Sequence, residues 1–190
     1  MRVIAGKYKS RKLKSLAGDN TRPTLDQVKE SFFNRLGPYF DKGTICDVFG
    51  GSGSILIEFL SRGVEQGIII ENNRGAIQVI KENLMNVDEP VKVFPISYQS
   101  ALKKIEGPLD YIYCDPPYQF KEKQKLFDLL RPLMNDASLL FYEADAKEQI
   151  DVPDFLETIR IDQYRRTQIL WLRIAQSQTD DGQSFDRVEN

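Results

Sequence analysis

The sequence has no histidine, only two cysteines and no long apolar run. Without histidine, the chain cannot use a histidine base, a histidine nucleophile or an imidazole metal ligand. The two cysteines, Cys46 and Cys114, lie in apolar strand-like runs, where a thiol packs as a small hydrophobic group. We therefore expect no metal site, and chemistry that depends on carboxylates, hydroxyls, aromatic rings, backbone groups or a cofactor.

No stretch approaches the roughly 20 apolar residues that cross a bilayer, and the first residues lack the apolar core of a signal peptide. These absences predict a cytoplasmic protein without a membrane partner. The length of 190 residues suits one domain with a sizeable core, which we expect to act as a monomer.

Positive charge is concentrated at the N-terminus. Residues 1–22 hold seven Lys or Arg and one acid, Asp19, so this segment carries +6 within a chain whose net charge is −2. A basic arm (1–23) on an acidic body predicts a polyanionic partner that the arm contacts, and the alternative is a solvated terminus. The candidate contacts with such a partner are Arg2, Lys7, Lys9, Arg11, Lys12 and Arg22.

Strand-like and helical segments alternate through the rest of the chain. A helix should begin near Thr24, where Thr24-Leu25-Asp26-Gln27 fits a capping box, and a hairpin is expected through Gly6 or Ser10. Apolar strands are expected at 44–49, 67–71, 91–96, 109–114 and 138–142, with helices between them. This alternation predicts a three-layer α/β fold with a parallel sheet covered on both faces.

The C-terminal part should differ from this pattern. Segments 155–163 and 167–175 are too close in sequence for a crossover helix, so they should pair as an antiparallel hairpin. The folded domain is then expected over 24–175, followed by a polar, acidic tail at 176–190.

A glycine turn follows the strand expected at 44–49. The segment Asp47-Val48-Phe49-Gly50-Gly51-Ser52-Gly53 opens a helix, whose first N–H groups are available to a ligand. It fits neither the dinucleotide fingerprint nor the P-loop. The next strand ends in Glu71, at about the 20-residue spacing where an acid binds ribose hydroxyls in related sheets. Alone, Glu71 could be a surface residue, but turn and acid together predict a nucleoside-type cofactor.

A second motif, Asp115-Pro116-Pro117-Tyr118, follows the strand expected at 109–114. Asp-Pro also begins ordinary turns, so the motif alone is ambiguous. If the sheet winds outward from the strand at 44–49, however, these two strands are neighbours at a switch point. Asp115 would then face the glycine turn across one crevice.

Together these motifs resemble those of class I S-adenosylmethionine-dependent methyltransferases, and Asp-Pro-Pro-Tyr resembles the motif of enzymes that methylate exocyclic amines of bases. The bacterial small-subunit (16S) ribosomal RNA guanine-N2 methyltransferases share, in order, Thr21-Arg22-Pro23-Thr24 with Lys29-Glu30, the glycine turn, Ser61-Arg62-Gly63 and Asp-Pro-Pro-Tyr. The resemblance covers about residues 1–175. It implies a Rossmann-like methyltransferase sheet, mostly parallel with a C-terminal antiparallel hairpin, S-adenosyl-L-methionine as cofactor, and ribosomal RNA or the small ribosomal subunit as partner.

Two positions depart from the pattern of this family, and the segment 167–175 lacks the glycine that usually precedes the last strand. Gly50 stands where alanine is usual, which we expect to be a small change. Ser97 stands where an aspartate near the cofactor adenine is usual, and its hydroxyl can hydrogen-bond only without charge, although Tyr98 can compensate by stacking. The cofactor residues that the resemblance implies are Asp47, Phe49, Gly50, Gly51, Ser52, Gly53, Glu71, Asn72, Ser97 and Tyr98.

The implied reaction explains why two prolines follow the acid. An exocyclic amine is a weak nucleophile because its lone pair is delocalised into the ring. If Asp115 and the Pro116 carbonyl each accept one N–H, that lone pair turns towards the methyl donor. Pro116 and Pro117 fix φ and remove competing donors, and Tyr118 stacks on the extruded base. We hypothesise methyl transfer to guanine N2; the alternatives are an adenine-N6 methyltransferase or a catalytically silent RNA-binding scaffold.

Overall fold

The computed structural model describes residues 1–16 and 23–176. The predicted RNA contact at Arg22 and all of the predicted tail after Gln176 lie outside these residues. Within the described part of the chain, no helix is long and apolar enough to cross a membrane.

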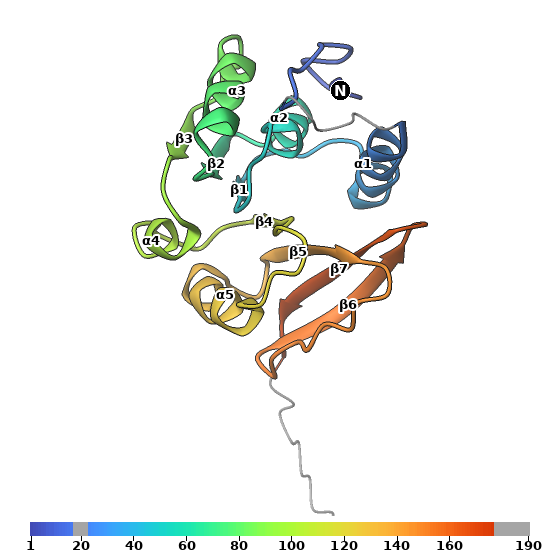
Figure 1. Cartoon of the computed structure of the whole chain (residues 1–190), viewed down its shortest axis with the longest axis vertical. Coiled ribbons are helices and arrows are strands. Elements are labelled where there is room, and N and C mark those ends of the chain that lie inside the picture. The colour runs from blue at the N-terminus through green and yellow to red at the C-terminus, as the bar shows by residue number, and fades with distance from the viewer. Residues whose placement is uncertain (17–22, 177–190) are drawn as a thin grey trace, which may run out of the picture.

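Seven strands form one sheet with helices on both faces (Figure 1). The strands are β1 (Thr44–Asp47), β2 (Gln66–Ile70), β3 (Val91–Phe94), β4 (Tyr111–Cys114), β5 (Leu139–Asp145), β6 (Leu156–Gln163) and β7 (Thr167–Ile174). The helices are α1 (Pro23–Leu36), α2 (Ser54–Ser61), α3 (Arg74–Leu84), α4 (Tyr98–Leu102) and α5 (Lys123–Leu130), the last followed by a 3₁₀ turn, η1 (Arg131–Leu133). Strand β5 continues three residues beyond its expected end because its last residues pair with β7.

The strand order is β3-β2-β1-β4-β5-β7-β6. Strands β1 to β5 are parallel, and β7 pairs antiparallel with both β5 and β6. The predicted fold class is therefore confirmed, including the antiparallel hairpin. Because β1 lies between β2 and β4, the chain winds outward from β1 in both directions, and a crevice is expected at the carboxyl end of this switch point.

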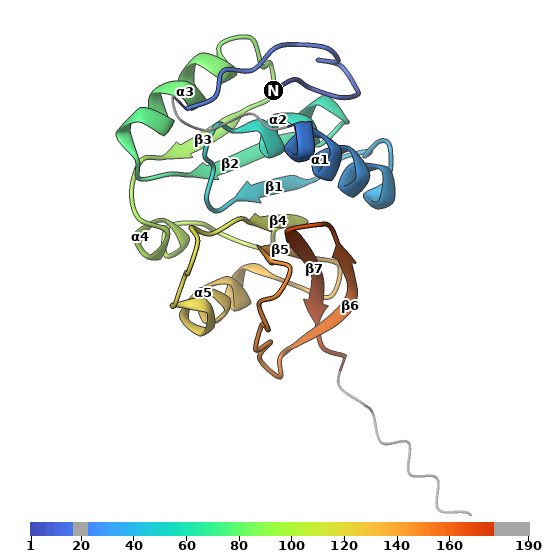
Figure 2. The ribbon, with the colours of Figure 1, turned by 45° about the vertical axis from the view of Figure 1, so that its right-hand side comes forward.

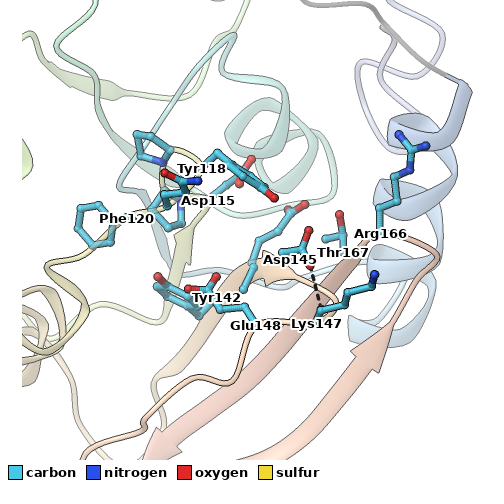
Figure 3. A pocket seen from close by; sticks show the side chains of 14 residues that line it. Asp115, Tyr118, Phe120, Tyr142, Asp145, Lys147, Glu148, Arg166 and Thr167 are labelled. Atoms are coloured by element: carbon cyan, nitrogen blue, oxygen red, sulfur yellow. Dashed lines mark hydrogen bonds between the residues drawn. The ribbon is translucent and has the colours of Figure 1, made fainter.

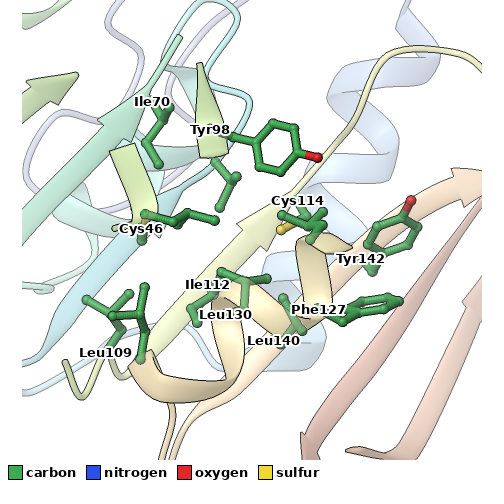
Figure 4. Packing of buried hydrophobic residues seen from close by; sticks show 14 of the residues in the cluster. Cys46, Ile70, Tyr98, Leu109, Ile112, Cys114, Phe127, Leu130, Leu140 and Tyr142 are labelled. Atoms are coloured by element: carbon green, nitrogen blue, oxygen red, sulfur yellow. The ribbon is translucent and has the colours of Figure 1, made fainter. Parts of the chain in front are cut away.

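Two apolar clusters, one on each face, hold the sheet between the helices (Figure 2). One cluster packs α1 and α2 against the sheet through Phe32, Phe33 and Leu56. The other packs α4 and α5 against the opposite face, and Figure 4 shows Cys46 and Cys114 within it. Both thiols are fully buried and unpaired, as expected for cysteines that pack as small hydrophobic groups.

The described arm, residues 1–16, forms a short hairpin that packs on the body of the protein. Arg2 and Lys12 form an antiparallel bridge, and Gly6 in the connecting turn has φ +82°. Val3 and Leu13 are buried in the cluster beneath α1 and α2. The arm is thus attached to the core through its apolar side chains, while its basic residues point outward or contact α3.

A buried carboxylate, Glu58 in α2, fixes the arm by hydrogen bonds. It accepts from the backbone N–H groups of Ile4 and Ala5, at 2.8 and 3.0 Å. It also forms ion pairs with Arg62 at 3.0 Å and Lys29 at 3.4 Å, and all three charged side chains are almost fully buried. A buried acid needs such a complete set of partners, because removal of one partner would leave an uncompensated charge.

The motif residues at 61–63 have the same structural role. Ser61 Oγ donates to the Ala5 carbonyl at 2.5 Å and accepts from the Tyr8 N–H at 2.9 Å. Gly63 has φ +114°, and a Cβ at this position would lie 2.0 Å from the Phe40 carbonyl oxygen. Ser61 and Arg62 thus help to attach the arm, whereas Gly63 allows the close approach of the Phe40 backbone.

Candidate active site

Three acids meet at the carboxyl edge of the sheet. Asp47 is the last residue of β1, Glu71 directly follows β2, and Asp115 directly follows β4. The carboxyl ends of parallel strands share one edge, so the two motifs predicted from the sequence do lie on one edge of the sheet.

Three cavities open along this edge. The inner cavity, about 260 Å³, is lined by the glycine turn together with Asp47, Asp115, Glu143 and Lys29. The side cavity, about 210 Å³, is lined by Phe49, Glu71, Asn72, Ser97, Tyr98 and Phe120 among others. The outer cavity, about 770 Å³, lies between the Asp-Pro-Pro-Tyr segment and the ends of β5 and β7 (Figure 3). Asp115 lines both the inner and the outer cavity.

The glycine turn needs its glycines for two different reasons. Gly51 and Gly53 have φ of +53° and +77°, a region that side chains disfavour. At Gly50 the reason is space, because a Cβ would lie 2.3 Å from Cγ1 of the buried Ile69. An alanine at position 50 of this chain would therefore require the Ile69 side chain to move.

Glu71 binds the backbone of the glycine turn through its carboxylate. One carboxylate oxygen accepts from the Gly51 N–H at 2.9 Å, and the other accepts from the N–H groups of Asn72 and Asn73 at 2.8 and 2.7 Å. A carboxylate has about four acceptor sites, so Glu71 can still accept from a ligand hydroxyl. The residue predicted to bind ribose thus also links β2 to the turn that follows β1.

Asp47 lies at the base of the inner cavity and is almost completely buried. Burial, assisted by the nearby negative charge of Glu71, raises the pKa of Asp47 to about 7. A cationic group in this cavity would favour the ionised form of Asp47.

Aromatic side chains and a helix end form the side cavity. The rings of Tyr98, Phe49 and Phe120 contact one another, with centroid distances of 5.5 to 5.6 Å, and the Tyr98 hydroxyl donates to Glu122 at 3.1 Å. Ser97 is the N-cap of α4, where its Oγ accepts from the Ser100 N–H. Serine and aspartate are both good N-cap residues, which explains how either can occupy this position.

The Asp-Pro-Pro-Tyr segment is open to solvent. Asp115 and Pro117 are exposed, and the Tyr118 side chain is 81% exposed. Gln119 has φ +64°, and the Phe120 N–H donates to the Pro117 carbonyl, which closes the turn. Figure 3 shows Asp115 and Tyr118 at one rim of the outer cavity, opposite Asp145 and Lys147.

Glu143 is a site residue that the sequence analysis missed. It lies near the end of β5, lines the inner and outer cavities, and accepts a hydrogen bond from the Tyr113 hydroxyl at 2.6 Å. Burial raises the pKa of Glu143. Its position after the apolar run at 139–142 was a usable signal, because β5 ends at the same edge as β4.

The predicted RNA contacts of the arm fall into two groups. Lys7 pairs with Asp88 and Glu89 at 2.9 and 3.0 Å, and Arg11 donates to backbone carbonyls at 83 and 86. Arg2, Lys9 and Lys12 have exposed side chains, and none of them forms an ion pair with another described residue. Among these five residues only Lys7 has its charge paired with acids, because the carbonyls that bind Arg11 are neutral.

Comparisons with known proteins agree with this architecture. A family model described as Conserved hypothetical protein 95 matches residues 1–173. The protein YlbH of Bacillus subtilis, named as a candidate rRNA methyltransferase, is 41% identical over 81% of this chain and 86% of its own. Ribosomal RNA small subunit methyltransferase D of Haemophilus influenzae is 30% identical, with 81% and 83% covered. The solved structure of a candidate methyltransferase, yhhF of Escherichia coli, has a TM-score of 0.79 and 28% identity over 93% of this chain and 99% of that protein.

Proposed function

We propose, from the premise that the chain belongs to the family described as Conserved hypothetical protein 95, that it transfers a methyl group from S-adenosylmethionine to ribosomal RNA. We further propose that the acceptor is the exocyclic N2 amine of a guanine in small-subunit ribosomal RNA. The observation that carries this proposal is the position of Asp115. Asp115 lines both the inner cavity, which is built around the glycine turn, and the outer cavity, which is large enough for a base.

The residues at the edge of β1 and β2 fit the cofactor. The glycine turn allows close backbone approach, Glu71 offers acceptor sites to ribose hydroxyls, and Asp47 can face an ammonium group in the inner cavity. The side cavity between Phe49 and Tyr98 offers an aromatic wall to a purine ring. When bound, the cofactor supplies a methyl group that is already activated on a sulfonium.

The chain then has to orient the acceptor and exclude water. Asp115 and the Pro116 carbonyl each accept one N–H of the amine, which directs the nitrogen lone pair towards the methyl group. On accepting a methyl group from the sulfonium, the amine would lose one proton, which Asp115 or water would take up. Tyr118, which is exposed at the rim of the outer cavity, stacks on the base after it has left its RNA helix.

The arm supports an RNA partner by its charge. Arg2, Lys9 and Lys12 are exposed on one docked hairpin, so they can contact phosphates while the cavities receive the base. We propose that this hairpin positions the protein on its substrate without reading sequence.

Two measurements test the proposal. Mass spectrometry of nucleosides from modified RNA should detect N2-methylguanosine, whereas N6-methyladenosine would favour the adenine-N6 alternative. Titration of S-adenosylmethionine by calorimetry should show saturable binding, and its absence would favour a catalytically silent scaffold. Mapping of modified nucleotides in RNA from a strain that lacks this protein would identify the target.

A further inference from the structure

Glu143 and Asp115 occupy corresponding positions on neighbouring parallel strands. The register pairs Cys114 with Tyr142, so each acid lies one residue beyond this pair. Neighbouring strands are about 4.8 Å apart, which places the two carboxylates side by side at the edge of the sheet. Both acids line the inner and the outer cavity.

The Glu143 carboxylate is held in place by one bond and retains one available oxygen. Tyr113, which is buried, donates its hydroxyl to Oε2 at 2.6 Å. Across residues 1–16 and 23–176, Oε1 has no hydrogen-bond partner, and no Lys or Arg forms an ion pair with Glu143. Because Glu143 lines both cavities, this oxygen is accessible to a hydrogen-bond donor of a ligand.

The edge of guanine that carries N2 offers such a donor. N1 of guanine bears a hydrogen and is the ring atom next to the carbon that holds the N2 amine. If Asp115 receives the amine, a neighbouring carboxylate therefore meets N1–H. Adenine instead presents N1 as an acceptor, which would place a lone pair against a carboxylate.

We propose that Glu143 accepts the N1–H of the target guanine and thereby selects guanine over bases whose N1 is an acceptor. This inference rests on the proposed function, because it takes guanine N2 as the methylated atom. It makes Glu143 a specificity-determining residue beside Asp115, which orients the amine. Sites that hydrogen-bond a substrate polar group discriminate strongly against analogues that lack it, because the site group is then left unpaired.

The test uses the mapped target guanosine and its replacement by 2-aminopurine riboside, which keeps the amine but has an acceptor at N1. The parent protein should prefer guanine by at least about 100-fold in kcat/KM. Glu143→Gln should narrow this preference at least tenfold, because a carboxamide can donate to an N1 acceptor. Without methyl donor, the fluorescence of 2-aminopurine should report tighter binding by Glu143→Gln than by the parent.

Two further variants separate recognition from general damage. Glu148→Gln removes a charge from the same outer cavity and should leave the preference ratio unchanged, whatever it does to the rate. Tyr113→Phe removes the bond to Oε2 but keeps the carboxylate, so it should retain most of the preference.

The inference is overturned if Glu143→Gln slows both substrates equally and leaves the ratio at the parent value. Glu143 would then serve only to fix Tyr113. If the parent produces no N2-methylguanosine, the proposed function fails, and the role of Glu143 in guanine selection fails with it. If the parent does produce it and the ratio does not change, only the inference about Glu143 fails.

Discussion

The two halves of the carboxyl edge are built differently. On the side of β1 and β2, Glu71 accepts three backbone N–H bonds and the glycine turn closes on itself, with Gly53 N–H donating to the Gly50 carbonyl at 2.7 Å. On the side of β4, the segment from Asp115 to Gln119 is largely exposed, and Tyr118 extends into solvent.

This difference suits a proposed division in which one half binds the cofactor and the other binds the base. The half at β1 and β2, where we propose that the cofactor binds, is organised by hydrogen bonds within the chain, so binding there should need little ordering. The half at the end of β4, where we propose that the base binds, is exposed and accessible to a substrate. Substitutions in the first half should therefore affect folding or cofactor affinity, whereas substitutions in the second should affect turnover with little effect on folding.

The largest effect is expected for Asp115→Ala in the half at the end of β4. Loss of the carboxylate that orients the amine should reduce turnover by about 10²- to 10⁴-fold. Because Asp115 is exposed, the free energy of unfolding should change by less than about 0.5 kcal/mol. Single-turnover kinetics measure the change in turnover, and calorimetry measures the affinity for the cofactor. Parent-like turnover would refute the orienting role of Asp115. A loss of cofactor affinity in Asp115→Ala would show that the two halves of the edge do not have separate roles.

The stability of the protein should depend on pH through Asp47, which lies in the half at β1 and β2. Its raised pKa, about 7, means that the folded protein binds a proton more tightly than the unfolded chain. The free energy of unfolding should consequently fall as pH rises from about 4 towards 7, by at most about 4 kcal/mol. Urea unfolding from pH 4 to 8 measures this loss. Asp47→Asn cannot ionise and should remove the corresponding part of the slope, while an identical pH profile would contradict the assignment to Asp47.

Glu71→Ala tests whether the hydrogen bonds of Glu71 to the glycine turn contribute to cofactor affinity. It removes the acceptor of three N–H groups and a proposed ribose contact, so cofactor affinity should weaken by about 1–3 kcal/mol. Glu71→Gln is the matched control, because its carbonyl oxygen can still accept from Gly51. Calorimetry with S-adenosylmethionine measures the change, and unchanged affinity for the alanine variant would leave Glu71 with no part in binding.

The smallest effect concerns the arm. Replacement of Lys9 and Lys12 by Gln should weaken RNA binding and flatten its salt dependence by roughly 0.7–0.9 units of slope per lost contact. Lys7→Gln is the internal control, because its charge is already paired with Asp88 and Glu89. Filter binding over a salt series compares these variants with the parent. Equal slopes for Lys9/Lys12→Gln and the parent would mean that the arm is a solvated hairpin.

The sequence predicted the sheet and the edge that carries the site because these depend on short-range patterns. Apolar strands, a glycine turn and Asp-Pro-Pro-Tyr are each readable within a few residues. The rule that parallel strands end at one edge then brings Asp47, Glu71 and Asp115 together. Glu143 obeys the same rule, yet an acid after an apolar run carries no distinctive pattern of its own.

The contacts that could not be predicted join residues far apart in sequence. Lys7 is paired with residues more than 80 positions away, and Arg11 with carbonyls at 83 and 86, so neither contact could be read from the charge count of the arm. The Gly50 substitution also depended on a distant side chain, Ile69, whose position follows only from the packing of β2 beside β1.

The docking of the arm on Glu58 has a consequence for how this chain can change over evolutionary time. Residues 4 and 5 bind Glu58 only through backbone N–H groups, so many arm sequences could provide these bonds. Glu58 itself must stay paired with Arg62 and Lys29. The surface charges of the hairpin can therefore change without loss of its attachment, which depends on the buried partners of Glu58. An arm exchanged between relatives should remain functional only when the recipient keeps Glu58, Ser61 and Arg62 as a set.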